Sequence, residues 1–342
     1  MESNATQSFE ESAIAILLKK NRDFAERGQR FLFPELPNIG EEHRELFLKA
    51  LSNPSLTIRF DEETYYAPSL SAARLTPTGE WMPAKISMSR SSFPKLADLV
   101  HELGHSIDYW FNRKTVLSRL VILSNGQTLL ETLQQELEKN KPVIMDEVLS
   151  FLADLIASHA YDENKAVIEK SLDAYKELVR LPVRYYDQEI RNRRKAILSK
   201  LYRSGFIDAY YKASLATFKA QGGQQYTIVL DVLSASVDVL RFTNYYIAPG
   251  HERSYYKNHP EKAATEFFAE VFAATALGNE AWLEPVKRLL PKSYQAFIEL
   301  HQRVKDCLLS GSTSFSCAIR QKDGTAIDCQ LTKGGKTNEI RI

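Results

Sequence analysis

The sequence predicts an α+β protein that is predominantly helical, with a small sheet in front of a helix that carries two histidines and a long helical insertion behind it. Three observations support this fold class. Apolar residues recur at helical spacing through most of residues 7–52 and 115–240. Between these regions, residues 56–89 contain short alternating runs that are typical of strands. The 342 residues are 44% hydrophobic, which is sufficient for one large domain or two ordinary ones.

The elements of the first hundred residues follow from local patterns. We expect two helices in the N-terminal region, with a break at Pro34–Pro37 because proline interrupts a helix. Leu56–Phe60 alternates between apolar and polar residues and predicts a strand. A second strand, Ala84–Ser89, leads directly into a helix whose start is indicated by Ser91–Pro94, a hydroxyl cap followed by proline.

The C-terminal part has a different character. Residues 315–321 and 325–331 alternate around Lys322-Asp323-Gly324, which predicts a hairpin. Cys317 and Cys329 either face each other across this hairpin or are two buried thiols. We expect N-terminal helices in 1–52, the sheet and the two-histidine helix in 53–114, a helical insertion or separate domain in 115–240, two further helices in 241–310, and the hairpin with a tail in 311–342.

Composition excludes several classes of protein. The net charge of +1 gives no electrostatic reason to expect binding to nucleic acid or to an anionic membrane. Three cysteines form no disulfide framework and favour a reducing compartment. The apolar run Ala13–Leu18 lies in an amphipathic pattern and is read as a helix rather than a signal peptide. No stretch approaches the roughly twenty apolar residues of a membrane span, so we expect a soluble protein.

The most informative motif is His101-Glu102-Leu103-Gly104-His105. On a helix, two histidines four residues apart point to one side, and their imidazoles can bind one zinc ion per chain. Glu102 lies between them and leans toward the open coordination position, where a carboxylate can take a proton from zinc-bound water. The motif therefore predicts a zinc site with a general base.

The alternative interpretation is a solvated helix face with two stray histidines. The context argues against it, because an apolar stripe at helical spacing places both histidines at the edge of a buried face. Gly104 leaves space beside the ligands, at a cost in helix propensity. The stripe consists of Leu96, Leu99, Val100, Leu103 and Ile107.

A catalytic zinc site usually needs a third protein ligand. Glu266 and Glu270 are four residues apart on a predicted helix with an aromatic side, so one can bind zinc while the other orients a ligating histidine. The alternative is a helix with two exposed glutamates. Asp108 stands one turn after His105 and is either a ligand of a variant site or, as we prefer, a supporting residue behind the ligands.

The approach to the second helix carries further candidates. Residues 250–256 are polar and aromatic, and a tyrosine hydroxyl there can donate a hydrogen bond to the oxyanion of a tetrahedral intermediate. Tyr255 is the first candidate and Tyr256 the second. His251 is a supporting residue in the same segment.

In two blocks the chain resembles the catalytic domain of the anthrax lethal factor group of zinc peptidases, a zincin-like metallopeptidase domain. The first block is residues 101–108, which includes an aspartate after the second histidine. The second runs from about Gly250 to Leu308 and includes Glu266-Phe267-Phe268-Ala269-Glu270 and Pro291–Ile298. Together the blocks cover about a quarter of the chain.

The resemblance implies His101 and His105 as ligands, Glu102 as general base, Glu266 as third ligand and Glu270 as a supporting residue. The chain departs from the family pattern in two ways. The family places a tyrosine seven residues before the third ligand, where this chain has His259; a small insertion restores a tyrosine, or His259 or His251 takes its part. About 160 residues separate His105 from Glu266, several-fold more than in the family. We interpret most of this stretch as a helical insertion that shapes substrate choice; the alternative is that another glutamate is the third ligand.

The expected function is a zinc-dependent endopeptidase that cleaves a specific protein. By resemblance we expect a bacterial effector or toxin that acts on a host protein in the host cytosol, exported without a signal peptide. The strand Ala84–Ser89 either pairs with an extended substrate or is an ordinary core strand. Two alternatives are an inactive scaffold whose zinc is closed by a fourth ligand, Asp108 or His259, and a zinc hydrolase that acts on another amide.

Overall fold

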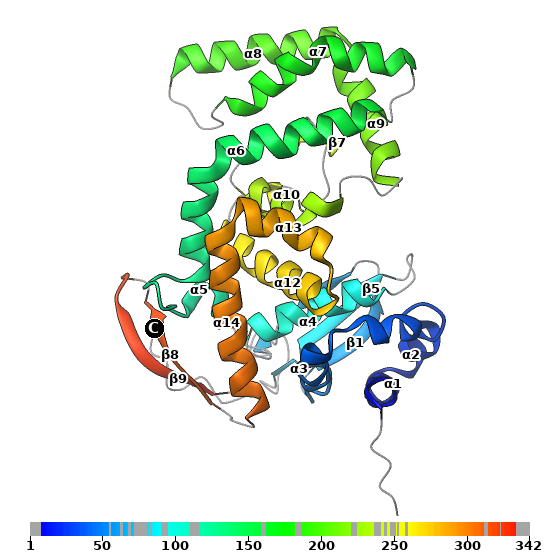
Figure 1. The fold of residues 1–342 in the computed structure, drawn as a ribbon, viewed down its shortest axis with the longest axis vertical. Coiled ribbons are helices and arrows are strands. Elements are labelled where there is room, and N and C mark those ends of the chain that lie inside the picture. Colours follow the sequence, from blue (N-terminus) through cyan, green and yellow to red (C-terminus); the bar gives the residue numbers. More distant parts are fainter. Residues whose placement is uncertain are drawn as a thin grey trace, which may run out of the picture. The chain divides into compact units, whose positions relative to one another are not determined.

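A computed structural model gives the fold as two compact units (Figure 1). Unit 1 comprises Met1–Glu131, Ala264–Glu280 and Gln295–Ile342, and unit 2 comprises Thr132–Ala263 and Ala281–Tyr294. The predicted class is confirmed: the protein is mostly helical, with a small sheet before the two-histidine helix. The structure describes residues 8–54, 56–61, 64–67, 70–71, 81–82, 84–89, 95–109, 116–158, 162–181, 187–219, 224–235, 241–242, 245–246, 251, 253–256, 259–310, 314–321 and 323–332.

The N-terminal helices of unit 1 are α1 (Phe9–Lys20), α2 (Arg22–Gly28) and α3 (Glu41–Leu51), with the 3₁₀ helix η1 (Phe33–Asn38) before α3. The break at the two prolines is therefore real, but one more break occurs at Asn21. This residue ends α1, and its side chain accepts a hydrogen bond from the backbone N–H of Phe24, which starts α2.

The main sheet has the strand order β1 (Leu56–Asp61), β5 (Ala84–Ser89), β2 (Tyr65–Ala67). Strand β1 runs parallel to β5, and β2 runs antiparallel to it. Because β5 has a neighbour on each side, it is a core strand, and the hypothesis that it pairs with a substrate is wrong. A second small pair joins β3 (Leu70–Ser71) to β4 (Trp81–Met82).

Helix α4 (Leu96–Asp108) follows β5 and packs against β5, β2 and α3. The expected cap at residues 91–94 lies outside the described residues, and the helix begins at Leu96. A side chain distant in sequence caps its first turn, since the backbone N–H of Leu96 donates to Glu35 Oε2 at 3.2 Å. The predicted apolar stripe is buried along its whole length.

Unit 1 is completed by α5 (Leu117–Leu120), most of α12 (Lys262–Ala276), most of α14 (Pro291–Leu309) and the antiparallel pair β8 (Ser314–Arg320) and β9 (Ala326–Thr332). The predicted hairpin is confirmed. Cys317 and Cys329 stand directly opposite each other in its register. Gly324 adopts a φ of +86° in the turn, which is a conformation that favours glycine.

Unit 2 is helical. It contains most of α6 (Leu129–Ser158), then α7 (Asp162–Arg180), α8 (Gln188–Arg203), α9 (Phe206–Lys219), η3 (Gln224–Tyr226), α10 (Thr227–Ser234), α11 (Arg253–Tyr256) and most of α13 (Glu280–Leu289), with one small pair, β6 (Arg241–Phe242) and β7 (Tyr245–Tyr246). Helices α7, α8 and α9 lie side by side (Figure 1). Tyr175, Phe206 and Tyr210 form their buried aromatic core, with ring centroids 5.1–5.5 Å apart.

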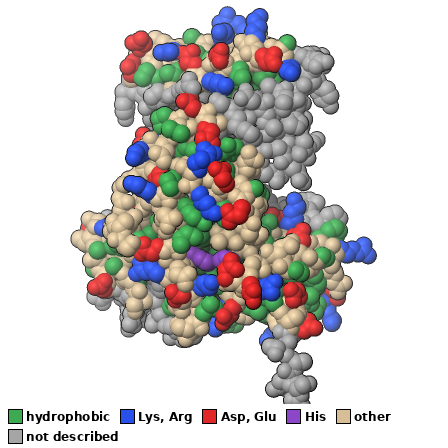
Figure 2. Space-filling model, in the orientation of Figure 1, with side chains coloured by type: hydrophobic (Ala, Val, Ile, Leu, Met, Phe, Trp, Pro, Cys, Tyr) green, Lys and Arg blue, Asp and Glu red, His purple; other side chains and the backbone are tan. Residues whose placement is uncertain are grey.

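Charges of both signs are interspersed over the face of the molecule in Figure 2. The basic run Arg191–Lys195 is mostly exposed on α8, where Arg193 pairs with Glu177 of α7 at 2.7 Å. Across the described part of the chain, every helix is too short or too polar to span a bilayer.

Candidate metal centre

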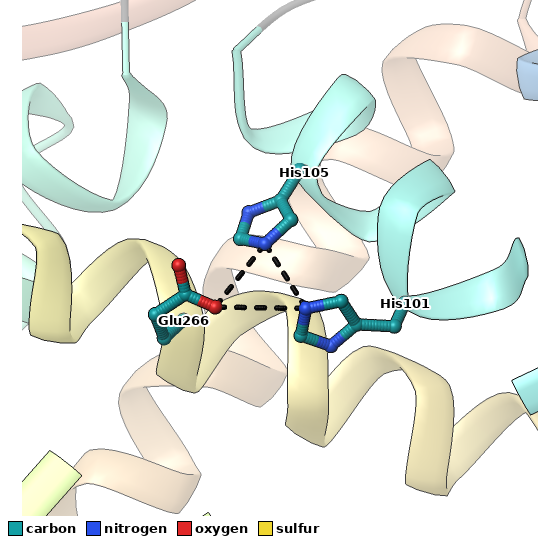
Figure 3. A group of neighbouring side chains, drawn as sticks. All are labelled: His101, His105 and Glu266. Carbon is teal, nitrogen blue, oxygen red and sulfur yellow. Dashed lines mark hydrogen bonds and ion pairs between the residues drawn. The ribbon is translucent and has the colours of Figure 1, made fainter. Parts of the chain in front are cut away.

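Helix α4 directs the imidazoles of His101 and His105 toward the same point (Figure 3). Their Nε2 atoms are 3.1 Å apart, and the two rings are nearly perpendicular. This arrangement follows from the helical spacing of four residues, which stacks the two side chains on one face. The prediction that both histidines face one position is confirmed.

Helix α12 brings a carboxylate to the same point from a distant part of the sequence (Figure 3). Glu266 Oε2 lies 3.5 Å from His101 Nε2 and 3.2 Å from His105 Nε2. Glu266 is only 2% exposed, whereas the side chain of His101 is 22% exposed, so the triangle is open on the side of His101. His101, His105 and Glu266, the group that the sequence and the resemblance together indicated, therefore meet in the folded chain.

The three ligand atoms fit a tetrahedral metal ion. Bonds of about 2.0–2.1 Å at tetrahedral angles place ligand atoms about 3.3 Å apart, and the three distances here are 3.1, 3.2 and 3.5 Å. Two imidazole nitrogens and one carboxylate oxygen are a donor set that zinc accepts, and three ligands leave a fourth position for water. The chemistry of the donor set therefore fits zinc, while the identity of the metal is not fixed by geometry alone.

Gly104 explains how α12 can come so close to α4. A Cβ atom at Gly104 would lie 2.9 Å from Ala269 Cα, 3.1 Å from Phe272 Cδ1 and 3.2 Å from the Ala269 carbonyl oxygen. Two of these three contacts are to backbone, which cannot rotate away. The space that we expected beside the ligands is thus filled by α12, and the glycine sets the helix separation that brings Glu266 to the histidines.

Glu102 is buried on α4 next to the ligands, with 5% exposure. Glu270 is half-buried on α12, one turn after the third ligand. The positions of both residues on their helices agree with the expected ones. Their roles, general base for Glu102 and support for Glu270, stay predictions.

Asp108 ends α4 and anchors the chain that follows. Its Oδ1 accepts from the Ser118 backbone N–H at 2.7 Å, and its Oδ2 accepts from the Ser118 hydroxyl at 2.8 Å. Complete burial raises the pKa of Asp108 to about 7, although both hydrogen bonds act in the opposite direction. Both carboxylate oxygens thus serve the first turn of α5, which favours support over metal ligation for this residue.

In unit 2, the residues expected to assist the reaction gather around Asp231 of α10. This fully buried carboxylate accepts from the Tyr256 hydroxyl at 2.7 Å, from the His251 backbone N–H, and faces His251 Nδ1 at 3.2 Å. The His251 ring stacks on Tyr255 at 4.1 Å, and Lys262 Nζ lies 3.9 Å from the centre of the Tyr255 ring. The Tyr256 hydroxyl is therefore engaged and buried, while the His251 side chain is 40% exposed.

Sequence reasoning missed Asp231. The residue is the one charge in the apolar run Ile228–Leu233, and buried charges are rare unless they have partners. This isolated charge was the available indication. His259, in contrast, is exposed and lies 3.2 Å from Glu261.

Comparison of the chain with family models, with curated proteins and with solved structures gives no match. The chemistry of the site is therefore argued from its own residues. What these residues establish is a candidate metal centre with the ligand set of a zinc hydrolase.

Proposed function

We propose that this protein is a zinc-dependent endopeptidase. The convergence of His101, His105 and Glu266 on one point is the observation that carries the proposal. A buried site with three protein ligands and one open side is the arrangement that hydrolytic zinc enzymes use. Glu102, which follows the first ligand directly, provides the carboxylate that such a reaction needs.

His101, His105 and Glu266 would hold the zinc ion, which would polarise the scissile carbonyl and lower the pKa of water to about 7. Glu102 takes the proton of the attacking water and passes it to the leaving amine. Asp108 keeps the end of α4 in place through Ser118.

The donor to the oxyanion is proposed to come from residues 251–256. Tyr255 and Tyr256 were the first candidates, but the Tyr256 hydroxyl is buried and donates to Asp231. We propose His251 ahead of both, because its Nδ1 side faces Asp231 and its side chain is substantially exposed.

The substrate is proposed to be a protein. The resemblance to the lethal factor group supports an effector or toxin protease that cleaves a host cytosolic protein. The alternative of an inactive scaffold needs a fourth protein ligand. Asp108 is engaged by Ser118 and His259 lies beside Glu261, so the described residues favour an open site.

The first test is metal content by elemental analysis of the purified protein and of His101→Ala and Glu266→Ala. We expect one zinc per chain in the wild type and loss of zinc in both variants. His259→Ala, which removes an exposed histidine from α12's approach, is the matched control and should keep its zinc. Zinc that survives in Glu266→Ala would refute the ligand set.

The second test separates a peptidase from a metal-binding scaffold. Wild type and Glu102→Gln are incubated with a library of peptides from a digested proteome, and new termini are identified by mass spectrometry. We expect defined cleavage by the wild type and at least about 1,000-fold slower cleavage by the zinc-loaded variant. Equal cleavage by both proteins, or none by the zinc-loaded wild type, would contradict the proposal.

A further inference from the structure

Two histidines that the proposed reaction does not use are buried together in unit 1. His43 of α3 and His301 of α14 are 3% and 5% exposed, and their ring centroids are 5.3 Å apart. His301 stacks parallel to Phe297 at 5.5 Å. Phe272 of α12 lies 6.4 Å from the His43 ring and 5.7 Å from the His301 ring. The pair thus joins α3, α12 and α14 through aromatic packing.

The surroundings of the pair disfavour protonation. His43 Nδ1 and His301 Nε2 are buried and have no hydrogen-bond partner among the described residues. Among the described residues, the charged groups that act on the pair are Glu42 of α3, 3.5 Å from His43 Nε2, and Lys305 of α14, and His43 itself acts on His301. From α12, the Phe272 ring packs against both histidines. Burial lowers the pKa of His301 to about 3. Burial also lowers the pKa of His43, and the nearby Glu42 carboxylate is the one influence that raises it.

The same aromatic packing reaches the metal centre. Phe272 lies on α12 six residues after Glu266, and its Cδ1 is among the three atoms nearest to the Cβ position of Gly104 on α4. Movement of α12 away from the histidine pair would therefore also move Glu266 relative to His101 and His105. The pair and the ligand triangle share one helix.

We propose that the His43–His301 pair is an acid-sensitive latch, which holds α3, α12 and α14 together at neutral pH and releases them in mild acid. The release loosens α12, so the proposed peptidase would be confined to neutral surroundings. Only this last consequence rests on the proposed function. The latch itself is a property of the fold of unit 1.

The direction of the pH effect on opening follows from proton linkage. In the opened state the imidazoles take up protons near their ordinary pKa of about 6.5, whereas in the closed state burial lowers the pKa of His301 to about 3 and lowers the pKa of His43 as well. Acid therefore favours opening, and the latch is at full strength above about pH 6.5. At pH 5, His301 alone should increase the equilibrium constant for opening about 30-fold, and His43 should add to this.

The test is hydrogen exchange of α3 and α14, measured by mass spectrometry at pH 7.5 and pH 5.0 and corrected for intrinsic exchange rates. The protein is kept zinc-free with a chelator, so release of zinc in acid and the proposed activity do not enter the result. Wild type should lose protection in these helices by about 30-fold or more on acidification. His301→Phe and the double variant with His43→Phe should lose much less.

His259→Phe, a change at an exposed histidine, is the matched control and should behave as wild type. Equal acid-induced loss in wild type and in the folded Phe variants would overturn the latch. A second measurement covers variants that fold poorly: the imidazole C–H resonances of His43 and His301 in the wild type. Normal titration of both resonances near pH 6.5 in the folded protein would also overturn it.

Discussion

Replacing Gly104 by alanine tests whether the close contact between α4 and α12 creates the metal centre. The added methyl would stand 2.9 Å from Ala269 Cα, at least about 0.5 Å closer than ordinary packing allows. Because the obstacle is backbone, the helices must separate. Overpacking of this kind costs about 1–3 kcal/mol, and better helix propensity returns about 1 kcal/mol. We expect a net loss of up to about 2 kcal/mol in the free energy of unfolding of unit 1.

The effect on zinc should be larger than the effect on stability. A shift of about 0.5 Å between Glu266 and the histidines exceeds the roughly 0.2 Å that metal–ligand distances tolerate. We expect zinc affinity to fall about 10–100-fold, measured by competition with a chromophoric chelator. Stability is measured separately on the zinc-free protein by thermal unfolding.

Gly28→Ala is the matched control. Gly28 is the last residue of α2 in unit 1, and its nearest heavy atom, Phe33 Cε1, is 3.4 Å from the Cβ position, which is an ordinary contact distance. This variant should keep the wild-type zinc affinity and unfold at or near the wild-type temperature. The reasoning is refuted if Gly104→Ala binds zinc as tightly as the control and is equally stable.

Three further predictions concern buried carboxylates and His251. Asp108→Ala should lower the free energy of unfolding by about 1–3 kcal/mol, because it leaves the buried donors of Ser118 without their acceptor. Asp108→Asn should cost less stability at pH 8 than at pH 5, because the raised pKa makes the charged aspartate unfavourable above about pH 7. Denaturant unfolding of the zinc-free protein measures both effects. Glu136→Ala should lower unit 2 stability by about 1–3 kcal/mol in thermal unfolding, because Glu136 accepts three hydrogen bonds at the start of α14, two of them from Ser293. His251→Ala should reduce kcat about 100-fold or more with unchanged zinc content, measured on the peptide that the wild type cleaves best.

Each of these predictions has an outcome that contradicts it. For the two carboxylates, an Ala variant as stable as the wild type would contradict the prediction, because the buried donors would then have other acceptors. Glu138→Ala, at an exposed position on α6, is the control for Glu136→Ala. For His251, a lower zinc content or an unchanged kcat would each remove it from the reaction, the first by assigning it a structural role.

Local patterns were sufficient to predict which side chains share a face, because helical periodicity fixes this. The spacing of His101 and His105 placed both on one side of a helix, and the second helix with its apolar side indicated Glu266 or Glu270. The choice of Glu266 followed from the resemblance to the lethal factor group. What escaped prediction depends on contacts distant in sequence. The start of α4 uses Glu35, 61 residues away, and the central place of β5 depends on the strand order, so neither could be read from neighbouring residues.

The buried polar partners escaped for the same reason. Asp231 contacts His251 and Tyr256, which follow it by 20 and 25 residues, so their meeting depends on contacts distant in sequence. Gly104 was recognised as a space, but its partner, the backbone of α12, could not be named from the sequence. A glycine on a helix indicates that another element packs closely against it, but only the folded structure identifies that element.

Helix α12 unites these features, and this leads to a final prediction. Glu266, Ala269 and Phe272 are spaced by three residues and lie on one side of the helix. Glu266 faces the imidazoles of the candidate metal centre, Ala269 lies against Gly104, and Phe272 packs against the His43–His301 pair. If α12 moves as one body, substitutions at Gly104 and at His301 must change the zinc affinity through the same displacement of α12. Their effects should then be coupled rather than independent.

A double-mutant cycle measures that coupling. Zinc affinity is determined at pH 6 for wild type, Gly104→Ala, His301→Phe and the double variant. We expect the affinity of the double variant to deviate from the sum of the single changes by more than about 0.5 kcal/mol, because a helix already displaced by the alanine gains little further restraint from the phenylalanine. Additivity within about 0.3 kcal/mol would show that the histidine pair and the zinc ligands respond to separate motions.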